Sequence, residues 1–321
     1  MTTTSTLYQS PPAVGKAHFS PRRLGHVNLW VSDLERSIRF YQKVCGIELV
    51  RRERAIKIAF HSNGNTHHDI GIIEISRGVD RVGRDGTVQI PATRGVAVGL
   101  NHLGWEMESE AALVDAYKRS GGRDGDVPLR AVDHLISHSV YLSDPDGNSH
   151  EFYADALQDW RSIYNLNRED EVTGTWDPDD GAPDPTPHSN VDPPLRKVVD
   201  APLHPGKLVA ATIATRNFFP MRDFFEEVAG LRQIGMSADP RAACFTGDLG
   251  RTDLMLMEAA AGASTGLQSF TFDLLAQPDE RALARMCGQW GLPPAQATTW
   301  NGMRALRLAD PDGFAIHFLQ A

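Results

Sequence analysis

The hydrophobic pattern near the start of the chain changes from a continuous run to a helical spacing. The run VNLWV at 27–31 is typical of a buried strand. In the segment 33–46 that follows, Ile38, Tyr41 and Cys45 recur at intervals of three and four residues, and a glycine comes directly after them. This pattern predicts a strand followed by a short amphipathic helix that the glycine ends.

Polar residues mark the start of each predicted helix. Ser32 and Glu35 have the spacing of a capping box, which predicts the start of the first helix. The strand-then-helix pattern restarts at Asn101, where Ser109 is the expected cap of a second helix and Gly121 its end. β-rich segments follow the helices, and the second unit closes with a hairpin through DPDG. Each unit is therefore expected to have the order βαβββ.

The chain also contains an internal repeat. Residues 33–46 match NFFPMRDFFEEVAG at 217–230, and LSDPDGNSHEFY at 142–153 matches LADPDGFAIHFL at 308–319. Self-similarity at this distance indicates a duplicated domain. The prediction is an α+β fold with four βαβββ units, paired into two domains.

We expect an N-terminal tail at 1–22, a first domain at 23–155, a linker at 156–205 and a second domain at 206–321. The linker is rich in Pro and Asp and has no periodicity, which is typical of an extended surface connection. A second irregular stretch at 77–98 interrupts the first domain. It is interpreted either as a lid over a site or as a surface insertion.

Composition excludes several classes of function. The 321 residues include 41% hydrophobic and 23% charged positions with a net charge of −9, which describes a globular protein without a basic nucleic-acid-binding face. Three widely spaced cysteines indicate no disulfide framework. No apolar run is long enough to span a membrane, and the first twenty residues lack the apolar core of a secretory signal. We expect a cytoplasmic protein whose N-terminal tail is either disordered or contacts another subunit.

Nine of the twelve histidines lie between His18 and His150. His26 and His102 occupy the same place in two copies of one unit, and Glu151 lies on the last strand of the second copy. Twofold packing of the two units would bring these side chains together. Two histidines and one carboxylate are the ligand set of mononuclear non-heme Fe(II) sites, which leave one face of the metal open.

The second domain acts as an internal control for this hypothesis. At the matching positions Ala210 replaces the first histidine, Ser269 the second, and His317 the glutamate. The repeat keeps the fold pattern but loses two ligands, so the three residues are not required for packing. The sequence therefore predicts one metal per chain, held by the first domain, and a structural role for His317.

The segments LGHVNLWVSDLERSIRFY, GLNHLGWEMES and SVYLSDPDGNSHEFY resemble the vicinal oxygen chelate superfamily, and within it the type I extradiol catechol dioxygenases. The resemblance implies half-open barrels around Fe(II), with Mn(II) as an alternative. It also implies opening of a small catechol-type diol by O₂ next to its hydroxyls, and a homo-oligomer. The best-known two-domain members carry their metal in the C-terminal domain, from which this chain departs.

The resemblance also assigns residues around the metal. In THHDIGI, His68 precedes Asp69 and matches the family's acid–base histidine, while strand alternation would point His67 to the other face. Tyr141 lies ten residues before Glu151, and a DPDG hairpin with a type I turn would place the two directly opposite each other. Tyr141 matches the catalytic tyrosine that hydrogen-bonds the substrate oxygen.

His134, seven residues before that tyrosine, matches a histidine that lines the distal pocket. Related enzymes have glycine where this chain has Leu135, which leaves the geometry of this loop open. His138 is a second candidate in the same segment.

Two further functions remain open. A glyoxalase-like isomerase or lyase would need a second glutamate from the first unit, for which Glu74 is the candidate. A metal-free sequestering protein of the bleomycin-resistance type would not need the complete triad.

Overall fold

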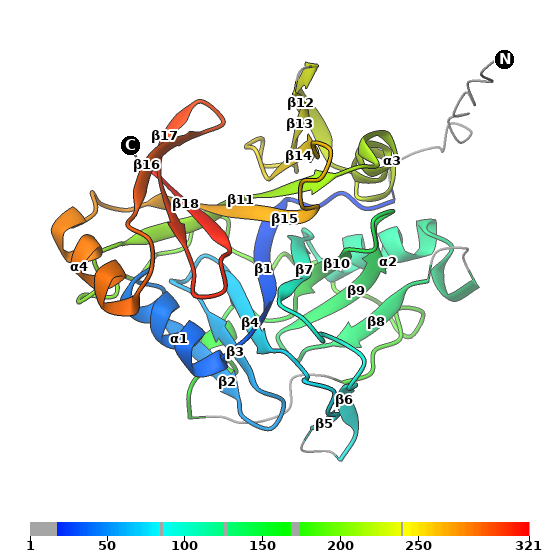
Figure 1. Ribbon diagram of the computed structural model, residues 1–321. Helices are drawn as coiled ribbons and strands as arrows, with labels where there is room; N and C mark the ends of the chain where they lie inside the picture. Colours follow the sequence, from blue (N-terminus) through cyan, green and yellow to red (C-terminus); the bar gives the residue numbers. More distant parts are fainter. Residues whose placement is uncertain (1–17, 84–85, 125–127, 168–173, 239, 321) are drawn as a thin grey trace, which may run out of the picture.

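The computed structural model describes residues 18–83, 86–124, 128–167, 174–238 and 240–320. It contains two eight-stranded curled sheets, one from each half of the chain, and each sheet carries two helices (Figure 1). This is the α+β fold that the sequence predicts.

The elements of the N-terminal half are β1 (Arg23–Val31), α1 (Leu34–Lys43), β2 (Leu49–Glu53), β3 (Ile58–His61), β4 (Ile70–Glu74), β5 (Arg81–Val82), β6 (Val88–Ile90), β7 (Gly99–Glu106), α2 (Glu110–Arg119), β8 (Arg130–Asp133), β9 (Ser137–Ser143) and β10 (Ser149–Asp155). Short 3₁₀ turns follow at Gly122–Asp124 and Trp160–Ser162.

The elements of the C-terminal half are β11 (Pro205–Thr215), α3 (Phe218–Asp223), β12 (Arg232–Ala238), β13 (Arg241–Thr246), β14 (Leu254–Glu258), β15 (Gly266–Leu274), α4 (Glu280–Trp290), β16 (Gln296–Trp300), β17 (Met303–Ala309) and β18 (Ala315–Leu319). A π-helical turn at Phe224–Val228 extends α3.

The strand order of both sheets confirms the four predicted βαβββ units. The first sheet runs β2-β3-β4-β1-β7-β10-β9-β8, and the second runs β12-β13-β14-β11-β15-β18-β17-β16. In each sheet the first strands of two units pair antiparallel at the centre, and the last strand of each unit lies parallel to its own first strand. The two units of one sheet are therefore related by a local twofold axis.

Local signals in the sequence place the helix ends and one hairpin. Ser109 caps α2 as predicted, because its side chain accepts a hydrogen bond from the backbone of Ala112. The expected cap of α1 was wrong by one residue, since Asp33 accepts from the backbone of Arg36. A carboxylate at this position also interacts favourably with the helix dipole.

The DPDG hairpin between β9 and β10 has the predicted register. Gly147 adopts a positive φ of 85°, and its N–H donates to the carbonyl of Asp144. Tyr141 pairs directly with Glu151, so the two side chains lie on the same face of the sheet.

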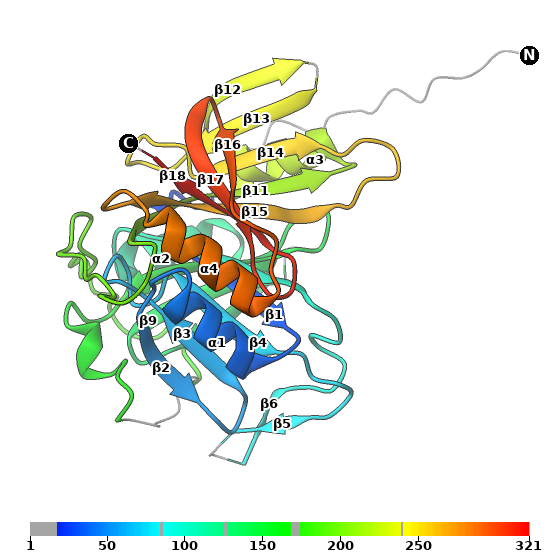
Figure 2. The same ribbon diagram turned by 60° about the vertical axis from the view of Figure 1, so that its left-hand side comes forward.

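The two halves share one apolar core. Helices α1 and α4 lie side by side (Figures 1 and 2), and the rings of Phe40 and Trp290 are 6.1 Å apart. Phe19 stacks on Phe152 at 3.9 Å, and its backbone N–H donates to the carbonyl of Val228 in the other half. The predicted tail therefore ends inside the molecule, while its residues 1–17 lie outside the described residues.

The DPDG turn of each half also contacts the other half. Asp310 accepts a hydrogen bond from Tyr41 at 2.9 Å, and Asp312 accepts from the backbone of Ser32. In the opposite direction, Asn217 donates to Asp146. These reciprocal contacts fix the two sheets relative to each other.

The linker crosses the surface of the N-terminal half. The carbonyl of Asp184 accepts from Ala111, and the backbone N–H of Arg196 donates to Asn63. Within the described part of the chain, no helix is both long and apolar enough to cross a membrane.

Burial raises the pKa of Asp310 from 3.8 to about 6, which makes stability depend on pH. The stabilisation from the neutral form is complete below pH 3.8 and is lost as the pH rises through 6. Asp310→Asn does not titrate, so from pH 4 to pH 7 the variant should gain about 3 kcal/mol relative to the parent chain. Urea unfolding at several pH values measures this difference, and a constant difference would contradict the predicted cost.

Candidate metal centre

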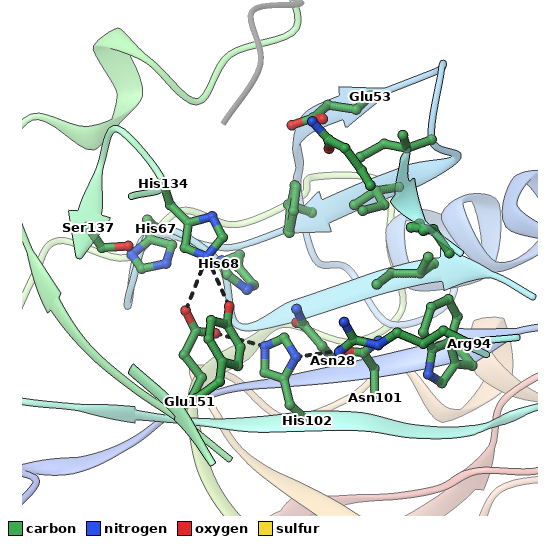
Figure 3. Close-up of a pocket in the computed structure, with 18 of the residues that line it drawn as sticks. Asn28, Glu53, His67, His68, Arg94, Asn101, His102, His134, Ser137 and Glu151 are labelled. Carbon is green, nitrogen blue, oxygen red and sulfur yellow. Dashed lines mark hydrogen bonds and ion pairs between the residues drawn. The ribbon is translucent and has the colours of Figure 1, made fainter. Parts of the chain in front are cut away.

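Two histidines and one carboxylate from three neighbouring strands meet on the concave face of the N-terminal sheet. Nε2 of His26 lies 3.2 Å from Nε2 of His102 and 2.9 Å from Oε2 of Glu151. Nε2 of His102 lies 2.8 Å from the same oxygen, and His102 and Glu151 face each other in Figure 3. All three side chains are buried. The structure thus brings together the three residues predicted from the sequence.

Strand register explains this convergence. In the antiparallel pair of β1 and β7, His26 lies opposite Gly104 and Asn28 lies opposite His102. In the parallel pair of β7 and β10, Glu151 lies beside Gly104. A Cβ at position 104 would lie 2.0 Å from Nε2 of His26, so the histidine ring needs the space that glycine leaves.

The surroundings prepare these groups to bind a cation. Burial lowers the pKa of His26 to about 4, so its imidazole is neutral at physiological pH. Burial alone would raise the pKa of Glu151, but hydrogen bonds from the two histidines hold it well below its usual range. Nδ1 of His102 contacts the side-chain oxygen of Asn101, and Ser139 donates to Glu151 at 2.6 Å. Such supporting contacts orient metal ligands in known sites.

The donor set fits a divalent metal. Ligands at right angles around an ion, with bonds of about 2.1 Å, are about 3.0 Å apart, and the three observed separations bracket this value. A second group, His26 with His67 and His68, has donor atoms within 4.8 Å of one another. The rings of His26 and His68 are stacked at 4.0 Å, however, so their in-plane lone pairs do not point at a common ion.

The twofold axis shows what occupies the place of a fourth ligand. The axis relates Gly104 to Asn28, and Glu151 lies beside Gly104. The counterpart of Glu151 is therefore the residue beside Asn28, which is Gly71. A Cβ at position 71 would lie 2.1 Å from Oδ1 of Asn28, so the Asn28 amide fills this space. Oδ1 of Asn28 is buried and has no hydrogen-bond donor among the described residues.

The C-terminal sheet has the same register without the donors. Ala210, Ser269 and His317 occupy the positions equivalent to the triad. Trp300 and Met255 pack with Ala210 in an apolar cluster at the corresponding place. Among the described residues, groups of three closely spaced metal donors occur in the N-terminal half alone.

The expected alternation of His67 and His68 was wrong. Both histidines lie in an irregular segment ahead of β4, where strand alternation does not apply, and both line the pocket. His68 stacks on His26, and neither of its ring nitrogens has a partner among the described residues. Nδ1 of His67 lies 3.0 Å from Asp155. Burial, followed by the charges of His26 and His67, lowers the pKa of His68 well below 6.5.

Tyr141 and His134 lie on the other side of Glu151. Nε2 of His134 is 2.9 Å from the Tyr141 hydroxyl and 3.6 Å from Oε1 of Glu151. Figure 3 shows the His134 ring above the Glu151 carboxylate. Burial raises the pKa of Tyr141 well above 10, so the hydroxyl keeps its proton. Leu135 adopts the left-handed conformation with a φ of 63°, so the turn retains a glycine-like geometry.

Two other candidates lie away from the pocket. Glu74 is the last residue of β4, and its carboxylate binds Lys57 and the backbone of Leu34. His138 points to the opposite face of β9 and contacts Glu110 at 2.7 Å. Neither side chain lines the cavity that adjoins the triad.

The triad opens onto a cavity of about 120 Å³. Its apolar wall consists of Trp30, Ile56, Ile58, Phe60, Ile73 and Ile90. Tyr164 from the linker, and Gln89 and Arg94 from the 77–98 stretch, also line it. Sequence periodicity gave no signal for these residues because they lie in short or irregular segments. The stretch is part of the pocket wall, and its function as a lid stays a prediction.

The N-terminal half of the chain is similar in sequence to known proteins. Residues 23–152 match the model of the Glyoxalase/Bleomycin resistance protein/Dioxygenase superfamily. A catechol-2,3-dioxygenase of Bacillus subtilis (strain 168) is 25% identical over 146 residues, which cover 46% of this chain and 45% of that protein. The chain therefore matches less than half the length of this relative.

A lactoylglutathione lyase of Neisseria meningitidis serogroup A is 31% identical over 136 residues, which cover 40% of this chain and 88% of the lyase. Among solved structures, the 2,3-dioxygenase LapB from Pseudomonas sp. KL28 has a TM-score of 0.62 at 15% identity, covering 95% of this chain and 94% of LapB. The Mn(II)-bound glyoxalase from Novosphingobium aromaticivorans has a TM-score of 0.60 at 15% identity, covering 93% and 82%.

At these identities the solved structures establish the fold and leave the chemistry open. The family model covers both units of the N-terminal sheet, where the triad lies, and the match to the lyase spans 88% of that relative. This chain is therefore a member of the Glyoxalase/Bleomycin resistance protein/Dioxygenase superfamily.

Proposed function

We propose that this protein is an extradiol-type dioxygenase that opens the ring of a catechol-type diol next to its hydroxyls. The main support is Gly71 at the twofold counterpart of Glu151. The site offers three protein donors, and no side chain from position 71 can close its open face. The proposed substrates are a small aromatic diol and O₂.

In this proposal His26, His102 and Glu151 hold Fe(II), with Mn(II) as the alternative. The bound metal would supply the redox chemistry that combines O₂ with the ring. Two imidazoles that bind through a lone pair carry no charge, so with one carboxylate they would leave a net positive charge at a divalent ion, which favours an ionised diol. The cavity's apolar wall would hold the ring and exclude water.

His68 is proposed as the acid–base residue. It is buried beside the open face, its lowered pKa keeps it neutral, and its ring nitrogens have no partner among the described residues. A neutral imidazole in this place can accept a proton from a diol hydroxyl and return it later in the reaction.

Tyr141 and His134 are proposed to position an oxygen of the substrate. The Tyr141 hydroxyl stays protonated and can donate a hydrogen bond to a developing oxyanion. His134 is close enough to share this proton with Tyr141.

A glyoxalase-like lyase is the second candidate, because the lactoylglutathione lyase is the more identical of the two relatives. Such an enzyme would need a fourth donor. Gly71 cannot supply one, and Glu74 is held by Lys57 away from the cavity. The dioxygenase therefore fits the site better.

Anaerobic loading with Fe(II), followed by oxygen-uptake assays on a panel of catechols, tests the proposal. Ring opening should consume O₂ and give coloured products with visible absorption. A loaded protein that consumes no O₂ with any catechol, but converts a hemithioacetal anaerobically, would establish the lyase in its place.

The chain should bind one metal. His26→Ala and Glu151→Ala should each abolish metal retention after desalting, because two donors hold an ion far less well than three. His317→Ala is the matched control at the equivalent strand position and should retain it. Elemental analysis measures the stoichiometry and circular dichroism the fold; two tightly bound metals per chain would refute the assignment.

His68→Phe and Tyr141→Phe should keep both metal and substrate but lose turnover. Positioned acid–base groups contribute roughly 10²-fold or more, so kcat should fall by at least that amount. Single-turnover oxygen uptake and anaerobic diol binding separate the two effects. Near-normal turnover of His68→Phe would transfer the acid–base role to His67 or His134.

Glu74→Gln should retain the metal and most of the oxygen uptake, because the carboxylate binds Lys57, Arg77 and the start of α1, away from the cavity. Metal content and oxygen consumption are measured on one preparation. Loss of both in a folded variant would revive Glu74 as a ligand.

A further inference from the structure

The wall of the cavity carries two arginines that the proposed chemistry does not use. Arg94 comes from the loop after β6, and Arg130 is the first residue of β8. In Figure 3 Arg94 lies on the same side of His102 as Asn101, across the pocket from His134. Both cations therefore line one cavity.

Arg94 has no anionic partner among the described residues. The Arg94 side chain as a whole is exposed, and partial burial of its guanidinium, followed by the positive charge of Arg130, lowers its pKa. Arg81, from the same insertion, is different: its guanidinium donates to the carbonyls of Ile56, Glu74 and Ile75. The fold thus pairs one arginine of the insertion with backbone carbonyls and leaves another facing the cavity.

Arg130 likewise has no carboxylate partner within the described ranges. Its guanidinium carbon lies over the Tyr141 ring, 4.5 Å from the centroid. Strand pairing fixes this contact, because Arg130 and Tyr141 are opposite each other on β8 and β9. A cation–π contact positions the guanidinium but does not neutralise its charge.

The carboxylates of the cavity are already engaged. Glu151 belongs to the triad, and Glu53 lies 3.4 Å from Arg51. Two positive charges therefore face the same cavity without local compensation. Like charges that face one cavity repel, and an anion bound between them removes that cost. A planar carboxylate suits this place because a guanidinium can bind it through two parallel hydrogen bonds.

We propose that Arg94 and Arg130 bind a carboxylate on the side arm of the substrate, so that the preferred diol is an aromatic acid. The inference rests on the proposed function for the diol, while the anion site is argued from the two arginines alone. With the diol at the triad and the carboxylate at the arginines, the apolar wall covers the ring between them.

Anaerobic calorimetry of the Fe(II)-loaded protein tests this inference without turnover. The probes are 3,4-dihydroxyphenylacetate and its primary amide, which has nearly the same shape without the charge. Hydrogen bonds to charged groups are worth about 1.5–3 kcal/mol, so the acid should bind about 10–100-fold more tightly than the amide. Arg94→Gln should reduce acid affinity towards that of the amide and leave amide affinity unchanged. Arg94→Lys should restore part of the preference.

Arg77→Gln is the matched control, because Arg77 belongs to the same insertion but is exposed and contacts Ser32. It should change neither affinity. Equal binding of acid and amide by the parent chain, or an equal loss of both in Arg94→Gln, would overturn the inference. Tight binding of S-methylglutathione in preference to both catechols would also overturn it. The two arginines would then bind the anionic groups of a different class of ligand.

The outcomes separate this inference from the proposed function. Acid-selective, Arg94-dependent binding without any O₂ consumption would support the anion site and refute ring cleavage. Rapid O₂ uptake with neutral catechols, without selectivity for the acid, would support ring cleavage and refute the anion site.

Discussion

The pairing of β1 with β7 is the constraint on which the site depends. Because the two strands are antiparallel and related by a twofold axis, histidines at equivalent positions come within 3.2 Å of each other. Their rings fit only because Gly104 has no side chain. β10 then runs parallel to β7, and its register brings Glu151 to the same point. The concave face of the curled sheet provides the cavity in front of the three donors. Each of these features follows from strand order rather than from any loop.

The twofold symmetry of the N-terminal sheet is broken at the position that the proposed chemistry would leave without a ligand. Four positions around the axis could carry donors, and the fourth is Gly71, whose space the Asn28 amide fills. The C-terminal sheet shows that the architecture does not need donors at all, because Trp300 fills the equivalent region with an apolar ring. Its contribution to the site is indirect, because it covers the back of the N-terminal sheet. The contacts that the DPDG turn of each half makes with the other half fix this arrangement.

Sequence patterns predicted the regular parts of this protein and failed in the irregular ones. The repeat identified four units, and the hairpin length placed Tyr141 opposite Glu151, because strand alternation and turn geometry are local rules. The same alternation misplaced His67, since its segment is not a strand. The candidate Glu74 lies on β4, three residues beyond the twofold position, which only the observed register reveals. Tyr164 reaches the cavity from a linker without any periodic signal.

The turn at Leu135 connects the backbone of this protein with its proposed chemistry. A non-glycine residue in the left-handed region costs about 1–2 kcal/mol, and Leu135 is 43% exposed, so its packing returns little of this energy. The conformation is held from both sides, because Asp133 accepts from the Leu135 N–H and the His134 N–H donates to Ser137. The tight turn directs the His134 ring to the Tyr141 hydroxyl. Strain that hydrogen bonds maintain next to a pocket is typical of functional sites. A relaxed turn would release the strain but would not keep His134 beside Glu151. The strained backbone therefore maintains the position of this histidine.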